Sequence, residues 1–241
     1  MRATILIIAM AVSCSVYAQC SVHSATMRPR LIELYTSEGC SSCPPAERWL
    51  RGARGDEDVV ALEFHVDYWD YLGWRDRFDN AYYTVRQREL ARRTGKGIIY
   101  TPEVALDGKV WRDWYSHRLP RESVRGMASM DLQVQPGSPL HVRVDTRFPD
   151  AGAADGFHNY IALTENGLSS RIRAGENRGK RLEHEDVVRA LAGPLPLAGS
   201  GVSLPVPKDV DLSKSSLVAF AQRPSDGAVA QVLKLPLASC H

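Results

Sequence analysis

Along the first 130 residues, runs of apolar side chains alternate with segments that carry apolar residues at helical spacing. Residues 30–37 (RLIELYTS) and 58–66 (DVVALEFHV) are mainly apolar and rich in β-branched and aromatic side chains, which predicts two buried strands. Residues 45–55 (PAERWLRGARG) lie between them, with apolar side chains at helical spacing and glycines near the end, which predicts a helix. A strand, a helix and a strand in this order predict parallel pairing with a right-handed crossover.

The next segments predict a helix, a hairpin and a further helix. Residues 80–95 (NAYYTVRQRELARRTG) begin with a capping residue, carry arginines in the last turn and end in glycine, which is typical of a helix. Residues 97–111 contain two short β-rich runs around Asp107-Gly108, which is a strong hairpin signal. A helix-like segment opens at Pro120 and is expected to extend over residues 120–130.

Beyond residue 131 the pattern changes to short alternating strands separated by Pro, Gly, Ser and Asp. Helical spacing is missing there, except around residues 184–191 (HEDVVRAL). The strand-like segments are LHVRVDT, NYIALTE, SLVAFAQ and AVAQVLKLPL. The sequence therefore predicts an α/β domain over residues 28–130, followed by a mainly antiparallel, sandwich-like β domain over residues 131–241.

The first 18 residues have the pattern of a signal peptide rather than of a folded element. Arg2 is followed by a short apolar run, and Val16-Tyr17-Ala18 is typical of a signal-peptidase site. The apolar run is shorter than the roughly 20 residues that span a bilayer, and no later segment is apolar enough to cross a membrane. We therefore expect a periplasmic or secreted protein without an integral membrane segment. A disordered or anchoring N-terminus is the alternative.

Composition narrows the function classes only slightly. The 241 residues are 44% apolar and 24% charged, which is ordinary for a globular protein. The net charge is +2 and no block of like charge stands out. Nothing therefore points to a nucleic acid as a partner.

Four cysteines follow the predicted signal peptide, an even number in a compartment that permits disulfides. Cys20 and Cys240 lie at opposite ends of the exported chain, where a bridge between them would join the termini. The alternative is that both thiols are free. Cys40 and Cys43 form a C-x-x-C motif between the first predicted strand and the helix that follows it.

This placement of the C-x-x-C motif suits thiol–disulfide exchange. A cysteine reacts as its thiolate, and the N-terminus of a helix favours an anion. We expect Cys40 to be the more exposed sulfur, which attacks a partner's disulfide, and Cys43 to resolve the mixed disulfide. Such a reaction needs no cofactor beyond the pair itself.

Two motifs resemble the thioredoxin superfamily: CSSC at the end of the first strand, and YTPEV before the hairpin. The resemblance implies that Pro102 is cis and packs beside the cysteines, and that the backbone at Thr101 pairs with a bound peptide strand. An ordinary trans proline at the start of an edge strand is the alternative. The motifs that narrow the resemblance are ELYTSEGCSSCPPAE, HVDYWDYLGW, YTPEVALDGK and, at residues 175–191, GENRGKRLEHEDVVRAL.

With these motifs the chain is similar to the secreted, thioredoxin-like family called domain of unknown function 1223. The resemblance implies a thioredoxin-like domain over residues 28–130. It also implies protein thiols or disulfides as substrates, together with an unidentified redox partner. Neither the motifs nor the family name identifies the substrate or the direction of electron flow.

The sequence departs from thioredoxin proper around the motif. Gly39 replaces the tryptophan that precedes the first cysteine, and Leu34 stands where thioredoxin has a buried acid. Glu33 is adjacent in sequence, but on a strand it would point to the opposite face. The usual proton acceptor for the resolving thiol is therefore missing. Pro45 is expected to begin the regular helix, which leaves the cysteines slightly ahead of it.

Polar and aromatic residues follow the second predicted strand. Because the carboxyl ends of parallel strands meet at one edge of a sheet, we expect the segment HVDYWD to lie near the cysteines. His65 and Asp67 are candidates for a proton relay, and Trp69 for a surface that binds an apolar substrate segment. The alternative is that these residues only pack within their own domain.

The leading hypothesis is an exported thiol–disulfide oxidoreductase. A copper-handling protein is a second hypothesis, because two thiolates and His65 suit a soft ion, although no fourth ligand is evident and we assign no metal site. The third is a non-enzymatic binding module in which Cys40 and Cys43 form a fixed bridge.

Overall fold

The computed structural model describes residues 20–240, with the exception of residues 117 and 136. The predicted signal peptide, residues 1–18, lies outside this part of the chain. Within it, two segments are α-helical, α1 (Pro44–Leu50) and α2 (Ala81–Arg93). Short 3₁₀ segments lie at Arg51–Ala53, Asp70–Leu72, Trp114–Ser116, Gly152–Ala154, Leu212–Lys214 and Leu237–Ser239.

The largest sheet has eight strands in the order β16-β15-β10-β13-β4-β3-β5-β6. β4 pairs in parallel with both β3 and β13, and the other neighbours are antiparallel. The strands are β3 (Arg30–Thr36), β4 (Val59–His65), β5 (Glu103–Leu106), β6 (Lys109–Val110), β10 (His158–Glu165), β13 (Val187–Leu195), β15 (Ser215–Gln222) and β16 (Val229–Pro236).

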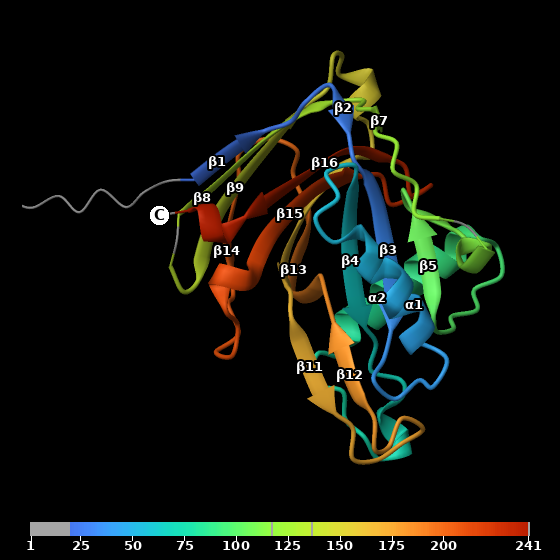
Figure 1. Cartoon of the computed structure of the whole chain (residues 1–241). Helices are drawn as coiled ribbons and strands as arrows, with labels where there is room; N and C mark the ends of the chain where they lie inside the picture. The colour runs from blue at the N-terminus through green and yellow to red at the C-terminus, as the bar shows by residue number, and fades with distance from the viewer. Residues whose placement is uncertain (1–19, 117, 136, 241) are drawn as a thin grey trace, which may run out of the picture.

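A second, antiparallel sheet has four strands in the order β1-β8-β9-β14. Its strands are β1 (Cys20–His23), β8 (Ser129–Gln135), β9 (Leu140–Arg147) and β14 (Ser200–Leu204). Two further antiparallel pairs join β2 (Met27–Arg28) to β7 (Val124–Arg125), and β11 (Leu168–Arg171) to β12 (Arg181–His184). In Figure 1 the β11–β12 hairpin extends below the large sheet.

The predicted fold class is wrong. The chain is mostly β, with 40% strand and 17% helix, and it is not an α/β thioredoxin fold followed by a separate β domain. The predicted strand–helix–strand unit exists locally as β3, α1 and β4, with parallel pairing of the strands. Its strands, however, belong to the same sheet as β10, β13, β15 and β16, which come from beyond residue 131.

Strands from both halves of the chain share one sheet because β13 pairs with the edge of β4 that β3 leaves free. This strand is buried along its whole length, so its outer backbone groups need hydrogen-bond partners. β13 supplies them: the N–H of Glu63 donates to the carbonyl oxygen of Asp186 at 2.9 Å, and Val187 pairs with Glu63. A local pattern of apolar residues does not reveal which distant strand will take such an edge.

Two segments predicted as helical form short strands and turns instead. Residues 120–130 contribute β7 and the first two residues of β8, a strand in which alternate residues are buried, as in a half-buried strand. Residues 184–191 contain the end of β12, a turn at Asp186 with φ +52°, and the start of β13. The β-branched pair at the start of β13 favours the strand.

Other local predictions are confirmed. α2 lies within the predicted range 80–95, and the Oδ1 of Asn80 accepts a hydrogen bond from the N–H of Tyr82 at 2.9 Å as its N-terminal cap. β5 and β6 form the predicted hairpin around Asp107-Gly108. Both turn residues have positive φ, +49° and +77°, which an Asp-Gly turn accommodates.

The two faces of the large sheet are covered by different elements. On one face, α1 packs against apolar residues of β3, β4 and β5, and the four-stranded sheet packs against β10, β15 and β16. On the other face, α2 packs over β3, β4, β10 and β15. The four-stranded sheet lies to one side of the helices in Figure 1. The face that carries α1, here called the α1 face, positions the candidate site.

Candidate functional site

The two cysteines of the motif form a disulfide between β3 and α1. The Cα atoms of Cys40 and Cys43 are 5.5 Å apart. Cys43 is the N-cap residue of α1, which begins at Pro44, one residue before the predicted start. The N–H of Cys40 donates to the carbonyl oxygen of Ser37 at 3.1 Å, which turns the chain after β3. A second disulfide joins Cys20 to Cys240.

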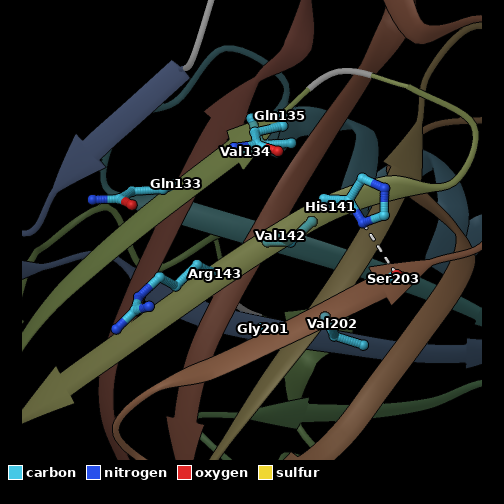
Figure 2. Close-up of a pocket in the computed structure, with 9 residues that line it drawn as sticks. All are labelled: Gln133, Val134, Gln135, His141, Val142, Arg143, Gly201, Val202 and Ser203. Atoms are coloured by element: carbon cyan, nitrogen blue, oxygen red, sulfur yellow. Dashed lines mark hydrogen bonds between the residues drawn. The ribbon is translucent and has the colours of Figure 1, made fainter.

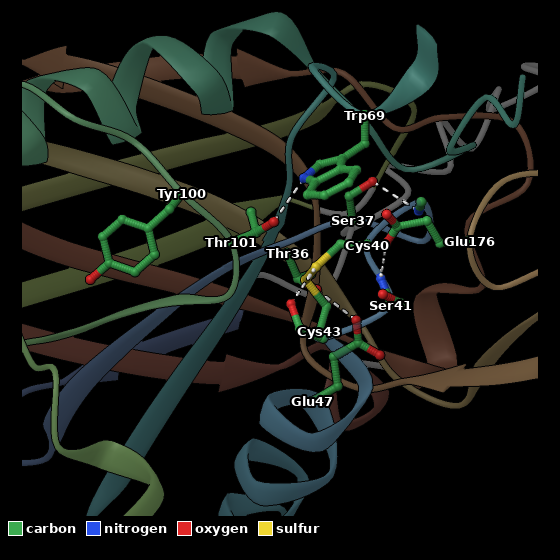
Figure 3. Close-up of a disulfide and its surroundings, with 12 residues drawn as sticks. Thr36, Ser37, Cys40, Ser41, Cys43, Glu47, Trp69, Tyr100, Thr101 and Glu176 are labelled. Carbon is green, nitrogen blue, oxygen red and sulfur yellow. Dashed lines mark hydrogen bonds between the residues drawn. A yellow bond between two sulfur atoms is a disulfide. The ribbon is translucent and has the colours of Figure 1, made fainter. Parts of the chain in front are cut away.

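The peptide bond between Thr101 and Pro102 is cis and lies beside the same end of β3. β5 pairs with β3 in antiparallel fashion, with Glu103 opposite Tyr35 near the end of β3. Pro102, the residue just before β5, therefore lies near the point where β3 leads into the motif. The Nε1 of Trp69 donates to the Oγ1 of Thr101 at 2.7 Å. Figure 3 shows Trp69 and Thr101 on one side of the disulfide.

Trp69 also explains the glycine before the first cysteine. A Cβ atom at Gly39 would lie only 2.9 Å from the Cβ of Trp69, so a larger residue at this position would collide with it. The position before the first cysteine is therefore bordered by a tryptophan from the segment that follows β4. This contact places Trp69, a predicted substrate-binding residue, beside the disulfide.

The expectation that Cys40 is exposed is wrong. Both cysteines are 0% exposed, while Ser41 and Ser42 between them are exposed. Residues 172–180, which connect β11 to β12 and are here called the cover loop, lie over the motif. The Nδ2 of Asn177 donates to the carbonyl oxygens of Glu38 and Cys40, each at 2.9 Å.

The rest of the cover is held by exposed polar groups. The Oε2 of Glu176 accepts a hydrogen bond from the N–H of Ser41 at 3.0 Å, as drawn in Figure 3. The Nζ of Lys180 donates to the Oδ1 of Asn177 at 2.9 Å. Among these polar residues of the cover loop, Asn177 is buried, whereas Glu176 and Lys180 are exposed.

The structure separates the two residues predicted as a proton relay. His65 lies on the α1 face, 2.6 Å from Asp76 and 2.9 Å from Glu63. Asp67 accepts a hydrogen bond from the Oγ1 of Thr84 in α2 at 2.6 Å, on the opposite face. The ring nitrogens of His65 thus contact carboxyls, and not the sulfur atoms as a copper site would require.

Glu33 is also on the far side, as its strand position predicts. The Nε of Arg86 in α2 donates to its Oε2 at 2.7 Å. Leu34 faces α1 within an apolar cluster. The carboxyl on the α1 face comes instead from the helix itself: Glu47 accepts a hydrogen bond from the Oγ1 of Thr36 at 2.6 Å, next to the disulfide in Figure 3.

Glu47 belongs to a group of six buried titratable side chains on the α1 face, each at most 4% exposed. They come from α1, β4, β12 and two loops, and we call them the histidine–carboxylate cluster. Its members are Glu38, Glu47, Glu63, His65, Asp76 and His184. His65 is the only member that the sequence predicted as a site residue. One available signal was Glu63 itself, a charged residue two positions before His65 in a mainly apolar strand, which is typical of a buried polar group with a partner.

His184 lies at the centre of this cluster. Its Nδ1 is 3.1 Å from the Oε1 of Glu63 and 3.6 Å from the Oε2 of Glu47. Its Nε2 is 3.4 Å from the Oε1 of Glu38. The ring of Phe78 packs against the rings of both His65 and His184, with centroids 5.2 and 5.5 Å away. An aromatic wall therefore shields one side of the cluster.

Burial and mutual pairing shift the ionisation of these groups. Burial, with the nearby charge of Glu63, raises the pKa of Glu47 to about 7. Burial alone would lower the pKa of His184, but its contacts with Glu38 and Glu63 raise it to about 9. The pKa of His65 is also raised, by Asp76 and Glu63, against the effect of burial. The cluster therefore favours charged imidazoles beside carboxylates.

A surface hollow lies elsewhere, on the four-stranded sheet. Figure 2 shows a shallow groove of about 370 Å³ on the four-stranded sheet, lined by residues of β8, β9 and β14. In it the side chains of Ser203 and His141 are 3.1 Å apart. Neither cysteine of the motif lines this groove, so the groove is separate from the disulfide. Among the described residues, no helix combines the length and apolar character needed to cross a membrane.

Comparisons with solved structures show the fold. A crystal structure of a protein from Agrobacterium tumefaciens is similar, with 22% identity, 88% of this chain and 96% of that chain covered, and a TM-score of 0.54. HBP35 of Porphyromonas gingivalis is also similar, with 13% identity and a TM-score of 0.60. The alignment covers 90% of this chain and 77% of that chain. At these identities the likeness is one of fold alone.

No curated protein matches the sequence. The family described as "Protein of unknown function (DUF1223)" matches it over residues 31–222, a range that includes the disulfide, the cis proline, the cover loop and every member of the histidine–carboxylate cluster. The chain therefore belongs to the DUF1223 family.

Proposed function

We propose that this protein is an exported thiol–disulfide oxidoreductase whose reactive group is the Cys40–Cys43 disulfide. The observation that supports the proposal is the placement of this C-x-x-C disulfide at the end of β3, with the cis Thr101–Pro102 bond at the same end of the neighbouring strand. Because proline has no N–H, it leaves the backbone edge beside the sulfurs open to a partner.

The exchange proceeds in two balanced steps. A substrate thiolate attacks the Sγ of Cys40, a new S–S bond forms, and the Cys40–Cys43 bond breaks with its electron pair on the Sγ of Cys43. A second thiolate of the substrate then attacks the substrate sulfur that is bound to Cys40. A disulfide forms within the substrate, and Cys40 is released as a thiolate. The substrate dithiol is oxidised to a disulfide and the motif is reduced to two thiols. The reverse sequence reduces a substrate disulfide.

Access to Cys40 requires the cover loop to move. Removal of the contacts of Asn177 and Glu176 would expose the motif, while β3 and α1 keep the sulfurs in place. A substrate segment that takes the place of the cover loop could pair with the backbone at Thr101 and rest on Trp69, which is half-buried. We therefore propose a gated site for protein thiols or disulfides.

The proposal is tested by the redox behaviour of the pair. The oxidised fraction of Cys40 and Cys43 is measured against glutathione buffers of stepped potential, and reduction of insulin is followed for the wild type and for Cys40→Ser. The variant Cys43→Ser should retain mixed disulfides with partners, because the resolving thiol is missing. The variant Cys20→Ser/Cys240→Ser is the control and should keep the activity.

A second candidate function is a binding module with a static bridge, and the complete burial of both cysteines favours it. In that case the pair is reduced only when the whole protein unfolds, insulin is not reduced, and Cys43→Ser traps no partner. A reduction rate equal to the rate of global unfolding would select this candidate over the oxidoreductase.

A further inference from the structure

The centre of the histidine–carboxylate cluster has the donor set of a transition-metal site. The Oε1 of Glu63 is 2.9 Å from the Nε2 of His65 and 3.1 Å from the Nδ1 of His184. These three atoms all lie within 4.8 Å of one another. Two imidazole nitrogens and a carboxylate oxygen that converge in this way are a set that binds zinc and related divalent ions.

The separations fit a metal ion with small adjustments. Zinc binds nitrogen and oxygen at about 2.0–2.2 Å in a tetrahedron, which sets neighbouring ligand atoms roughly 3.3 Å apart. The two contacts of Glu63 need to open by only a few tenths of an ångström to reach this spacing. A fourth ligand is at hand in Glu47, whose Oε2 is 3.6 Å from the Nδ1 of His184. Its other oxygen, Oε1, is held by Thr36.

The outer nitrogen of each imidazole faces a carboxylate. A metal on the Nε2 of His65 would leave the proton on Nδ1, which points at the Oδ2 of Asp76, 2.6 Å away. A metal on the Nδ1 of His184 would leave the proton on Nε2, which faces the Oε1 of Glu38 at 3.4 Å. Metal-bound histidines in proteins are commonly oriented by such carboxylate partners.

A separate observation also indicates a ligand. The Nε2 of His184 and the Oε1 of Glu38 are buried and have no hydrogen-bond partner, although they face each other within the cluster. A metal on the opposite nitrogen of His184 would fix the proton between these two atoms. Within the described residues, the ion pairs of the cluster join only its own members, so its four carboxyls face two imidazoles and neither a lysine nor an arginine. A bound divalent cation adds positive charge to this excess of buried carboxyls.

We propose that Glu63, His65 and His184 bind one divalent transition-metal ion of the zinc class. Glu47 completes the coordination, while Asp76 and Glu38 orient the two imidazoles. The site is distinct from the disulfide, since none of its ligands is a cysteine, and it does not depend on the proposed redox function. Its place on the α1 face, between α1, β4 and β12, makes the ion a link between elements that are far apart in sequence.

The first test uses Zn²⁺ on the full protein after treatment with a chelator. Equilibrium dialysis followed by elemental analysis should give about one zinc ion per wild-type chain. His184→Gln and Glu63→Gln should each weaken binding by at least about tenfold, since each removes a ligand. His141→Gln, which changes an exposed histidine on β9, is the matched control and should bind as the wild type does.

Two further measurements keep the proposal open to refutation if a ligand variant fails to fold. The variant Cys40→Ser/Cys43→Ser should keep its zinc, because the sulfurs are not ligands. Cobalt bound to the wild type should give the visible bands of a tetrahedral site without a thiolate charge-transfer band. Substoichiometric zinc on the folded wild type, equal binding by folded ligand variants, or loss of zinc in the cysteine variant would each overturn the proposal.

Discussion

Asn177 holds the cover loop over the disulfide, and its substitution by alanine should open the motif. Its side chain is 0% exposed, and its Nδ2 is the donor to the carbonyl oxygens of Glu38 and Cys40. Asn177→Ala removes both hydrogen bonds from the closed conformation. In an open conformation water satisfies the same carbonyls, so the substitution should destabilise the closed conformation selectively.

The magnitude follows from the two bonds. A buried hydrogen bond contributes about 1 kcal/mol net, so the loss of two should cost the closed conformation about 2 kcal/mol. The carbonyl oxygen of Cys40 keeps the N–H of Cys43 as a donor at 3.3 Å, which limits the added cost of an unsatisfied group. Since every 1.4 kcal/mol is a factor of ten, the open population should rise roughly 30-fold.

The assay is the rate at which dithiothreitol reduces the Cys40–Cys43 bridge under native conditions. Samples are quenched with an alkylating reagent, and the labelled peptides are quantified by mass spectrometry. If local opening is fast and rate follows its population, Asn177→Ala should be reduced roughly 30 times faster than the wild type. The Cys20–Cys240 bridge, which is partly exposed, serves as an internal reference and should keep its rate.

Glu176→Gln is the matched control, because Glu176 belongs to the same loop but is exposed. Its contact with the N–H of Ser41 is open to water, and the amide oxygen of a glutamine can still accept this hydrogen bond. The substitution should therefore change the rate by no more than about threefold. The free energy of unfolding of Asn177→Ala is measured as well, to show that the two hydrogen bonds were lost. If that free energy falls but the disulfide is reduced at the wild-type rate, the cover loop is not the gate.

Three further predictions concern stability. Cys20→Ser/Cys240→Ser should lower the free energy of unfolding by about 3–5 kcal/mol, because the bridge closes a loop of 220 residues; a urea titration that finds less than about 1 kcal/mol contradicts this. Burial raises the pKa of Glu103 from 4.5 to about 7, so the folded state holds this proton more tightly than the unfolded state, and stability should fall as the pH rises between these values. Thermal melting of Glu103→Gln should show a smaller decline over that range, and a profile equal to the wild type would argue against it. Gly39→Ala should cost about 1–3 kcal/mol because of the clash with Trp69, whereas an unchanged melting temperature would mean that the tryptophan moves aside freely.

The sequence predicts those parts of the fold whose signals lie in consecutive residues. The spacing of apolar side chains identified β3, α1, β4 and α2, and the Asp107-Gly108 pair identified the hairpin of β5 and β6. Pro120 predicts a helix over residues 120–130, but this segment contributes β7 and the start of β8. Alternation of buried and less buried residues along β8 indicates a strand more strongly than one proline indicates the start of a helix.

The sheet order could not be predicted, because it depends on contacts between distant segments. β13 pairs with β4 although more than a hundred residues separate the two strands along the chain. The apolar pattern of β4 does not indicate which distant strand pairs with it. The same limit applies to the site. Cys40, Cys43 and the cis proline are carried by local motifs, whereas His184 joins Glu63 only through the β11–β12 hairpin that the fold places over α1.

The bond between Cys20 and Cys240 makes the chain between them a covalent ring. A protease that cuts one surface loop therefore yields a nicked molecule of unchanged mass on a non-reducing gel, and the pieces separate only after reduction. New ends opened at a loop tip would leave the connectivity of both sheets intact as long as the old ends stay joined. This chain is thus suited to circular permutation, with the bridge replaced by a peptide linker.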